Sequence, residues 1–422
     1  RVPVMFGLSI PLEESEVGLE MDLLVGLENT TAGQREKYIP YLLDEQLLAW
    51  LEDSISAGNI EQGGFLWRGA LMSDVPELHT VQLFFNVDDA ALDYHPDWPA
   101  VTEIAGVVLI NDGAVSVWAD RARLLDSAVD SLSVEVWPDA ADQLRLAIDA
   151  SLEGPAADGL AVVNGGGLNQ LTGGAFSGWQ LAGNTSTELE LAMSLSAADA
   201  SPRVEVTTRF AGVDLDIDPG KLPVRNISGE LQYSSAKGFS STDLVGELWG
   251  RPLFATIGQL AASRRRSPAV TIDLASVVDI GDVRRWLEPE LLGFASGRSA
   301  VAMRLEISDG SSGRLRIDTE LDGVSLDLPS PWGKTAGTPR QLVLDLAQSG
   351  DDVELGIELE GGLKSRLKLA SGDLRSAALA FGEAPAELEA GVVRITGHAG
   401  RVDVAEWSRF INGYLLPGPE VD

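Results

Sequence analysis

Residues 47–94 read LLAWLEDSISAGNIEQGGFLWRGALMSDVPELHTVQLFFNVDDAALDY and set out a unit that recurs along the chain. The unit opens on a helix-like segment around Trp50-Leu51-Glu52 and breaks at Gly63-Gly64. It then continues as strand-like sequence and ends on Leu92-Asp93-Tyr94. The change of apolar period from that of a helix to two marks the passage from helix to strands.

The same order of features returns later in the sequence. The last copy has them at Trp286-Leu287-Glu288, Gly297 and Leu326-Asp327-Leu328. A middle copy keeps Gly183 and Leu215-Asp216-Ile217 but lacks the helix tryptophan. We therefore predict one continuous array with repeats of roughly 115 residues. Its predicted parts are the end of a preceding repeat (1–40), three repeats (41–165, 166–280 and 281–400) and the truncated start of another (401–422).

Sustained alternation of apolar and polar residues predicts strands with one apolar and one wet face. It is clearest in residues 81–87, 144–148, 189–195, 315–321, 342–346 and 353–359. Closely spaced turn signals such as Asn111-Asp112-Gly113 and Lys237-Gly238 favour antiparallel meanders. The predicted fold is mostly β: an elongated, strongly curved antiparallel sheet of repeated β-groove units, an open trough, with one short helix per repeat. We expect these helices at residues 47–57, between Asp44 and Gly58, at 282–292 and at 404–415.

Composition excludes several classes of function. The net charge of −33 argues against binding to nucleic acid or to anionic lipid surfaces. The absence of cysteine excludes disulfides, thiolate metal sites and cysteine nucleophiles. No apolar run reaches the length that crosses a bilayer, and no secretory signal opens the chain. Because strand-like sequence follows Arg1 at once, we expect the chain to be part of a longer protein.

Candidate sites for chemistry are few. His79, His95 and His398 lie in different parts of the repeats, with no partner at metal-ligand spacing. Gly165-Gly166-Gly167 lacks the spaced glycines of a nucleotide loop, so a hinge is favoured. We predict no catalytic residue, no metal and no cofactor.

Three other motifs have a functional and a structural interpretation. Asp214, Asp216 and Asp218 resemble the start of a calcium loop, but alternation with apolar residues favours the solvent face of a strand. Arg264-Arg265-Arg266 could contact a phosphate head group, although a solvated loop is favoured. Trp98 could stack on a sugar, but its place at a repeat turn favours packing on the sheet.

Four segments resemble motifs of the AsmA-like superfamily, most closely its YhdP branch. They are LDYHPDWP (92–99), VRNISGELQY (224–233), GVSLDLPSPWGK (323–334) and VRITG (393–397), in the expected order. The resemblance implies a non-enzymatic, periplasmic lipid-transfer protein, tethered to the inner membrane of a Gram-negative bacterium. Its expected partners are phospholipid and the inner and outer membranes, with no nucleic acid. This chain departs from the family pattern in lacking the N-terminal membrane helix, which we expect to be the result of truncation.

The resemblance also assigns a role to the apolar strand faces, which would line a groove for acyl chains. The expected lining residues are Val81, Leu83, Phe85, Leu144, Leu146, Ile148, Leu189, Leu191, Met193, Leu315, Ile317, Leu342, Leu344, Leu355 and Ile357. Two alternatives stay open at this point. One is a structural or adhesive β-repeat protein whose apolar faces form a closed core. The other is a carbohydrate-active β-protein, which the aromatic content of 6% supports poorly.

Overall fold

A computed structural model describes most of the chain. The residues it describes are 2–13, 18–31, 53–71, 78–165, 169, 174, 176–195, 201–217, 222–260, 269–287, 292–309, 312–350, 352–370, 373–382, 387–398 and 403–415. The described strands belong to one mixed sheet of 23 strands that is not closed into a barrel, and the helices are few and short. The prediction of a mostly β fold built on one open, largely antiparallel sheet is confirmed.

The chain divides into two compact units. Unit 1 consists of Arg1–Gly167, Asn184–Arg209 and Gln232–Lys237, and unit 2 consists of Leu168–Gly183, Phe210–Leu231 and Gly238–Asp422. The predicted repeat boundaries are a different division of the chain, and they stay a prediction.

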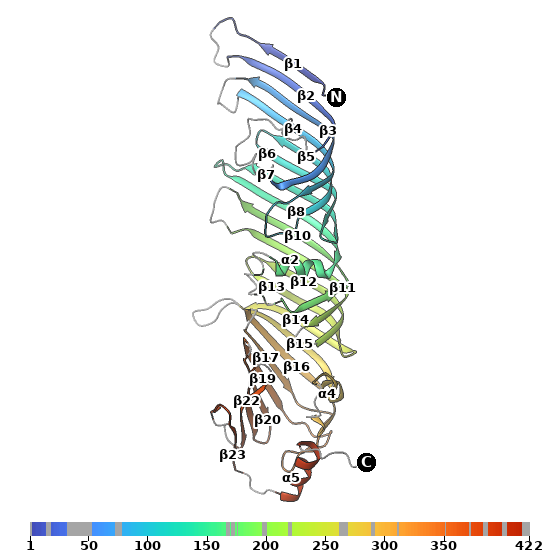
Figure 1. Cartoon of the computed structure of the whole chain (residues 1–422), viewed down its shortest axis with the longest axis vertical. Coiled ribbons are helices and arrows are strands. Elements are labelled where there is room, and N and C mark those ends of the chain that lie inside the picture. The colour runs from blue at the N-terminus through green and yellow to red at the C-terminus, as the bar shows by residue number, and fades with distance from the viewer. Residues whose placement is uncertain are drawn as a thin grey trace. The chain divides into compact units, whose positions relative to one another are not determined.

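In unit 1, each strand from β1 to β8 pairs antiparallel with the next, and β10 then pairs with β8 (Figure 1). The strands are β1 Val4–Ser9, β2 Glu20–Thr31, β3 Ile55–Ala70, β4 His79–Leu92, β5 Val101–Asn111, β6 Ala114–Leu124, β7 Ser127–Pro138, β8 Leu144–Pro155 and β10 Asn184–Ser194. Residues of β11 Arg203–Ile217 and β12 Leu222–Ser234 belong to both units.

In unit 2, antiparallel pairing runs through β13 to β17, passes from β17 to β19, and continues to β22. Among the described strands, β22 and β23 form the one parallel pair. Short β9 and β18 pair with β11 and β16. The strands are β9 Trp179–Ala182, β13 Gly238–Leu248, β14 Arg251–Leu260, β15 Ala269–Asp279, β16 Ala295–Asp309, β17 Ser312–Thr319, β18 Val324–Leu326, β19 Leu342–Ser349, β20 Asp352–Leu359, β21 Leu363–Ala370, β22 Asp373–Phe381 and β23 Val393–Gly397.

Two-residue turns keep consecutive strands antiparallel. Asp112 and Gly113, between β5 and β6, have φ of 47° and 91°. Trp249 and Gly250, between β13 and β14, have φ of 51° and 74°. Positive φ at both central residues is the turn geometry that matches the twist of a β-hairpin. Asp-Gly therefore acts at the first turn as the sequence predicts, whereas tryptophan at the second gives no such signal.

Helices recur at a fixed interval in the sequence. The helix α2 is Ala156–Asn164, α4 is Ile280–Leu287, and α5 is Val404–Phe410 followed by the π-helical turn η4 Ile411–Leu415. Their first residues, 156, 280 and 404, are 124 residues apart each time. The sequence predicted the last two positions but not α2, whose apolar run follows Pro155 without a strong cap.

Two of the predicted helix boundaries need correction. The helix expected at residues 282–292 begins earlier, at Ile280, as α4, and residues 288–291 of the expected helix lie outside the described residues. The first expected helix lies largely outside the described residues, but its last part is wrong, because Ile55 opens β3 and pairs with Leu92. Gly58, expected to end that helix, lies within β3 at a φ of 143°, beside register shifts that bend the strand.

An acidic side chain holds each helix to a neighbouring segment. The acid is the third residue in all three helices: Asp158, Asp282 and Glu406. Asp158 Oδ2 accepts hydrogen bonds from the Asp126 N–H at 2.9 Å and the Ser127 hydroxyl at 2.7 Å. Asp282 pairs with Arg251 at 3.7 Å, and Glu406 accepts the Ser330 N–H at 3.1 Å. Acidic side chains in the first turn also interact favourably with the helix dipole. These residues therefore both position and stabilise the helix ends.

The helix-side ends of the strands form small closed cores. In unit 1, Ile104, Ala119, Ala122 and Val129 are buried together, with Leu92, Val101 and Leu124 packed around them. Register shifts in β3, β4, β5 and β7 lie in the same part of the strands. Because a β-bulge bends its strand, these shifts account for strand ends that pack against one another.

Unit 2 has two such cores. One contains Leu215, Val224, Leu248 and Leu253, and the other contains Leu321, Val324 and Leu359. Buried Lys334 lies beside the second core and donates to the carbonyl oxygens of Leu321, at 2.8 Å, and of Val324. Burial lowers the pKa of the Lys334 amine, the charge of Arg340 adds to this, and Asp322 opposes it. The GVSLDLPSPWGK segment thus has a structural role, because its own Lys334 donates hydrogen bonds to two backbone carbonyls.

Among the described helices, none combines the length and the apolar character that crossing a bilayer requires.

Replacing Asp158 by alanine tests whether the acidic contact holds α2. Asp126 N–H and the Ser127 hydroxyl would lose their acceptor, which costs about 1–3 kcal/mol when a donor is left buried. Hydrogen exchange of the α2 amides should therefore become faster, with the exchange of β3 and β4 unchanged. Asp130→Ala, an exposed carboxylate of β7 with no described contact, is the matched control. Equal exchange in the two variants would contradict the assignment.

Candidate functional site

The strands of unit 1 present one continuous apolar face. Directly paired residues on neighbouring strands share a face of a sheet, so rows of residues can be followed across it. The first row, from β1 to β10, is Val4, Val25, Phe65, Leu83, Ile110, Val115, Val136, Leu146 and Met193. A second row, from β2 to β10, is Leu27, Gly63, Phe85, Val108, Val117, Val134, Ile148 and Leu191. No polar side chain interrupts either row.

Unit 2 repeats this arrangement with different residues. A row from β14 to β22 is Ile257, Ile272, Leu305, Leu315, Leu346, Leu355, Leu367 and Ala377. The adjacent row is Ala255, Leu274, Met303, Ile317, Leu344, Ile357, Ser365 and Leu379. Ser365 is the one hydroxyl in these two rows. We call the two surfaces the apolar faces of units 1 and 2.

All fifteen residues expected to line a groove lie on these apolar faces. Val81 is opposite Trp67, Leu189 is opposite Ala150, and Leu342 is opposite Leu359. Leu144 is opposite Pro138, and the other eleven are members of the four rows. Their role as a lining stays a prediction, but the register brings together residues that are far apart in the sequence.

Exposure separates the apolar faces from the closed cores. Of the fifteen residues, Leu83 is buried and Leu144 is 40% exposed, whereas the others are half-buried. The core residues Val213 and Val324 are fully buried. A closed sandwich would bury both groups to the same extent. The apolar faces are therefore only partly covered in this fold.

The apolar face of unit 1 also carries an aromatic pair that sequence reasoning missed. The rings of Trp67 and His79 stack with centroids 4.7 Å apart, and both belong to the apolar side of β3 and β4. Gly69 lies directly opposite His79, so no side chain separates the two rings. The Trp67 Nε1 and His79 Nδ1 atoms are buried and have no hydrogen-bond partner among the described residues. Contacts between diagonal neighbours depend on the register of the paired strands, which cannot be read from the sequence of either strand.

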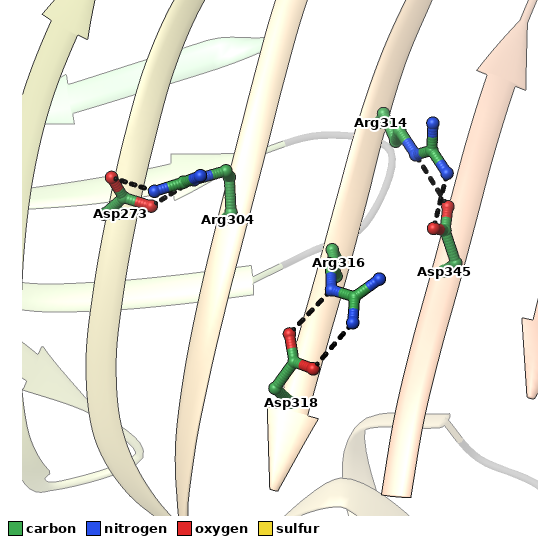
Figure 2. A network of polar contacts seen from close by, with 6 residues as sticks. All are labelled: Asp273, Arg304, Arg314, Arg316, Asp318 and Asp345. Atoms are coloured by element: carbon green, nitrogen blue, oxygen red, sulfur yellow. Dashed lines mark hydrogen bonds and ion pairs between the residues drawn. The ribbon is translucent and has the colours of Figure 1, made fainter. Parts of the chain in front are cut away.

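The opposite face of unit 2 is charged and internally paired (Figure 2). Arg304 binds both carboxylate oxygens of Asp273 on β15, at 2.6 and 3.0 Å. Arg314 binds those of Asp345 on β19, at 2.8 and 2.6 Å, and Arg316 binds those of Asp318 on its own strand. The hydrogen bonds to aspartate, followed by charge, raise the pKa of all three arginines. Strands β20 and β21 continue the pattern with Lys364–Glu358, Arg366–Glu354 and Lys368–Asp352.

The remaining candidate residues serve structure where they are described. Asp216 pairs with Arg225 at 2.7 Å, and Asp214 accepts the Asn226 N–H at 3.0 Å, so both carboxylates hold β11 to β12. Trp98 is 37% exposed in the turn after β4, where its N–H donates to the His95 carbonyl. Gly165 follows α2 directly. Asp218, Gly166, Gly167 and the arginine run 264–266 lie outside the described residues.

The histidines and acidic residues of the described part of the chain do not gather into a metal-binding cluster. No three His, Asp or Glu side chains there are close enough to hold a metal ion. His95 is exposed, and its ring nitrogen accepts the Asp97 N–H at 3.2 Å. His398, at the end of β23, uses its backbone N–H to bind the Phe381 carbonyl.

Comparison with known proteins places the chain in a family. The model of the YhdP protein family matches residues 9–420. The chain belongs to the YhdP family. It is 24% identical over 331 residues to a protein of Escherichia coli (strain K12) named intermembrane phospholipid transporter YhdP. That match covers 76% of this chain and 25% of the relative, so the chain spans about a quarter of the relative's length. No solved structure matches the chain.

The charged network of unit 2 should add little to stability. Asp345→Asn removes the two charged hydrogen bonds to Arg314, yet exposed ion pairs contribute about 1 kcal/mol or less. The free energy of unfolding, from urea titration, should fall by no more than that, and the difference should shrink in about 1 M salt. Glu320→Gln, at an exposed carboxylate without a described side-chain partner, controls for loss of charge alone. A loss of several kcal/mol would contradict this interpretation.

Proposed function

We propose that this chain is a non-enzymatic segment of a phospholipid conduit between the inner and outer membranes of a Gram-negative bacterium. Membership of the YhdP family and the name of the Escherichia coli relative support lipid transport. Because the chain spans only about a quarter of that relative, it would form one length of the path. This function places it in the periplasm, with tethering to the inner membrane as a further part of the proposal.

The observation that carries the proposal is the partly covered apolar face, continuous in register from strand to strand. An acyl chain makes no directional bonds, and it is held by the apolar area removed from water, at about 25 cal/mol per Å². A row such as Val136, Leu146 and Met193 offers aliphatic contact at every strand step, about 4.8 Å apart. A lipid could thus move from strand to strand without breaking a polar contact.

The polar parts of a phospholipid would stay outside this face. Hairpin turns rich in polar residues, such as Asn111-Asp112-Gly113, lie at the ends of the same strands. Phosphate and ester groups keep their water there, which avoids the cost of burying unpaired polar atoms.

Bound lipid is the first test. The chain, purified from a bacterial host in mild detergent-free buffer, should carry phospholipid that organic extraction and mass spectrometry detect. A solvatochromic dye added after delipidation should bind saturably. A closed structural core would give neither bound lipid nor saturable dye binding, and that result would favour the structural alternative.

Charged substitutions on the apolar face are the second test. Leu191→Asp and Leu355→Asp should each reduce transfer of a fluorescent phospholipid between donor and acceptor vesicles by about tenfold or more, because a buried carboxylate interrupts the row. Circular dichroism should show unchanged strand content. Ala192→Asp is the matched control, since Ala192 neighbours Leu191 but faces the other side, opposite Ala147. Transfer that is equal in Leu191→Asp and Ala192→Asp would refute the role of this face.

A further inference from the structure

The polar face of unit 1 carries a stripe of exposed apolar side chains that the lipid path does not use. Met5, Leu24 and Leu66 are directly paired across β1, β2 and β3, and Phe84 is paired with Leu109 across β4 and β5. All occupy positions that alternate with the apolar face. We define the exposed stripe by these residues and the next apolar side chain along: Met5, Leu24, Leu66, Phe84, Leu109 and Trp118.

The stripe is continuous from β1 to β6. Leu66 is opposite Gln82, so Phe84 is its diagonal neighbour, and Leu109 is opposite Ser116, two residues from Trp118. Diagonal neighbours on one face are about 7–8 Å apart, within reach of aromatic side chains. Its five strand steps of about 4.8 Å span about 24 Å across the strands, which corresponds to a helix of about 16 residues.

Five of its six side chains are exposed to solvent, and Leu66 is half-buried. Met5 is 70% exposed, Leu24 47%, Trp118 44%, and Phe84 and Leu109 38% each. Contiguous apolar surface of this kind on an otherwise polar face marks an interaction site. Ion pairs occur on both polar faces, for example Arg68–Asp22 beside the stripe in unit 1, but those of unit 2 extend over β15 to β21.

Charge at one end of the stripe indicates the chemistry of the partner. Asp149 on β8 is directly opposite Glu190 on β10, and Glu135 on β7 is a diagonal neighbour of Asp149. All three carboxylates are exposed, and in the described part of the chain none has a cationic partner. Like charges directly opposite each other are unfavourable until a cation binds between them. We call Glu135, Asp149 and Glu190 the acidic patch.

From these observations we propose that the exposed stripe and the acidic patch together dock an amphipathic helix of a partner protein, with leucine-like residues along the stripe and lysine or arginine over the patch. Acidic surface next to the stripe disfavours an anionic membrane and a second copy of a chain whose net charge is −33. The apolar side chains supply area, and the carboxylates set orientation and association rate.

A synthetic helix tests the proposal directly. The probe is a fluorescein-labelled peptide of about 26 residues, because the eight strand steps from β1 to β10 span about 38 Å. It carries leucine at helical spacing along the part over the stripe and lysine along the part over the acidic patch, and binding is followed by fluorescence anisotropy. Saturable binding should weaken about tenfold or more in Trp118→Asp and in Phe84→Asp. The double change Asp149→Lys with Glu190→Lys should weaken it several-fold, and the wild-type affinity should fall at about 0.5 M salt.

The controls separate docking from nonspecific adsorption. Phe254→Asp changes a polar-face side chain of unit 2 that is 58% exposed, and it should leave peptide binding as in the wild type. A leucine–glutamate peptide of the same pattern should bind at least about tenfold more weakly. Leu24→Ser serves as a second stripe variant should an aspartate change the circular dichroism spectrum.

Several outcomes would overturn the proposal. Unchanged peptide affinity in the stripe variants would place binding elsewhere, and equal binding of the glutamate peptide would remove the role of the acidic patch. Sedimentation that shows a dimer broken by Trp118→Asp would assign the stripe to a second copy. Vesicles of phosphatidylglycerol that bind the wild type but not Trp118→Asp would assign it to a membrane.

Discussion

Antiparallel register is the constraint on which this structure depends. Side chains alternate between the two faces of a strand, so a shift of one residue would send a whole strand's apolar set to the other face. In unit 1 the register holds from Val4 on β1 to Met193 on β10, although these residues are far apart in the sequence. The register shifts of β3, β4, β5 and β7 lie mainly beyond these rows, toward the helix-side ends. The irregularities thus bend strand ends without mixing the two faces.

The two units have similar apolar faces, but the side chains on their opposite, polar faces differ. Unit 2 covers β15 to β21 with paired charges, such as Arg304 with Asp273, which keep a large open sheet hydrated. Each pair contributes little to stability, so its main effect is solubility and the exclusion of unwanted contacts. Unit 1 also has ion pairs on that side, such as Arg68 with Asp22, but it keeps exposed aromatic and aliphatic side chains there, and Asp149 and Glu190 have no cationic partner among the described residues. One fold therefore offers a uniform face for apolar cargo and a second face free to differ between units.

Local patterns predicted those parts of the fold that depend on local sequence. Alternation identified strands such as residues 189–195, and Asp112-Gly113 identified a hairpin turn, because both signals are written in adjacent residues. The helix α2 was missed because Pro155 and the small residues after it give no cap signal, and the last part of the first helix was wrong because Ile55 fits either period. The parallel pairing of β23 with β22 depends on a crossover that neither strand encodes.

The residues of the site could likewise be predicted only where the signal lies within a single strand. The fifteen expected lining residues were inferred from their own strands. Val117 and Val134 were overlooked although they alternate as clearly, and Val108 lies in an apolar run without alternation. The Trp67–His79 stack, the exposed stripe and the buried Lys334 all depend on which residues lie across a strand pair or a loop. Register is a global property of the sheet, so no single segment could reveal these features.

The half-buried residues of the open apolar face contribute less free energy to folding than the residues of a closed core do, so the sheet must be stabilised elsewhere. The small cores at the helix-side strand ends supply this stability. Val324 is fully buried, and Ala119 and Leu253 nearly so, each in a cluster beside a strand end. The acidic contacts of Asp158 and Asp282 fix the helices near the same ends. Stability is thus concentrated along one end of the strands, and the middle of the apolar face is left free of tight packing, which is the arrangement that a surface for a mobile, apolar cargo requires.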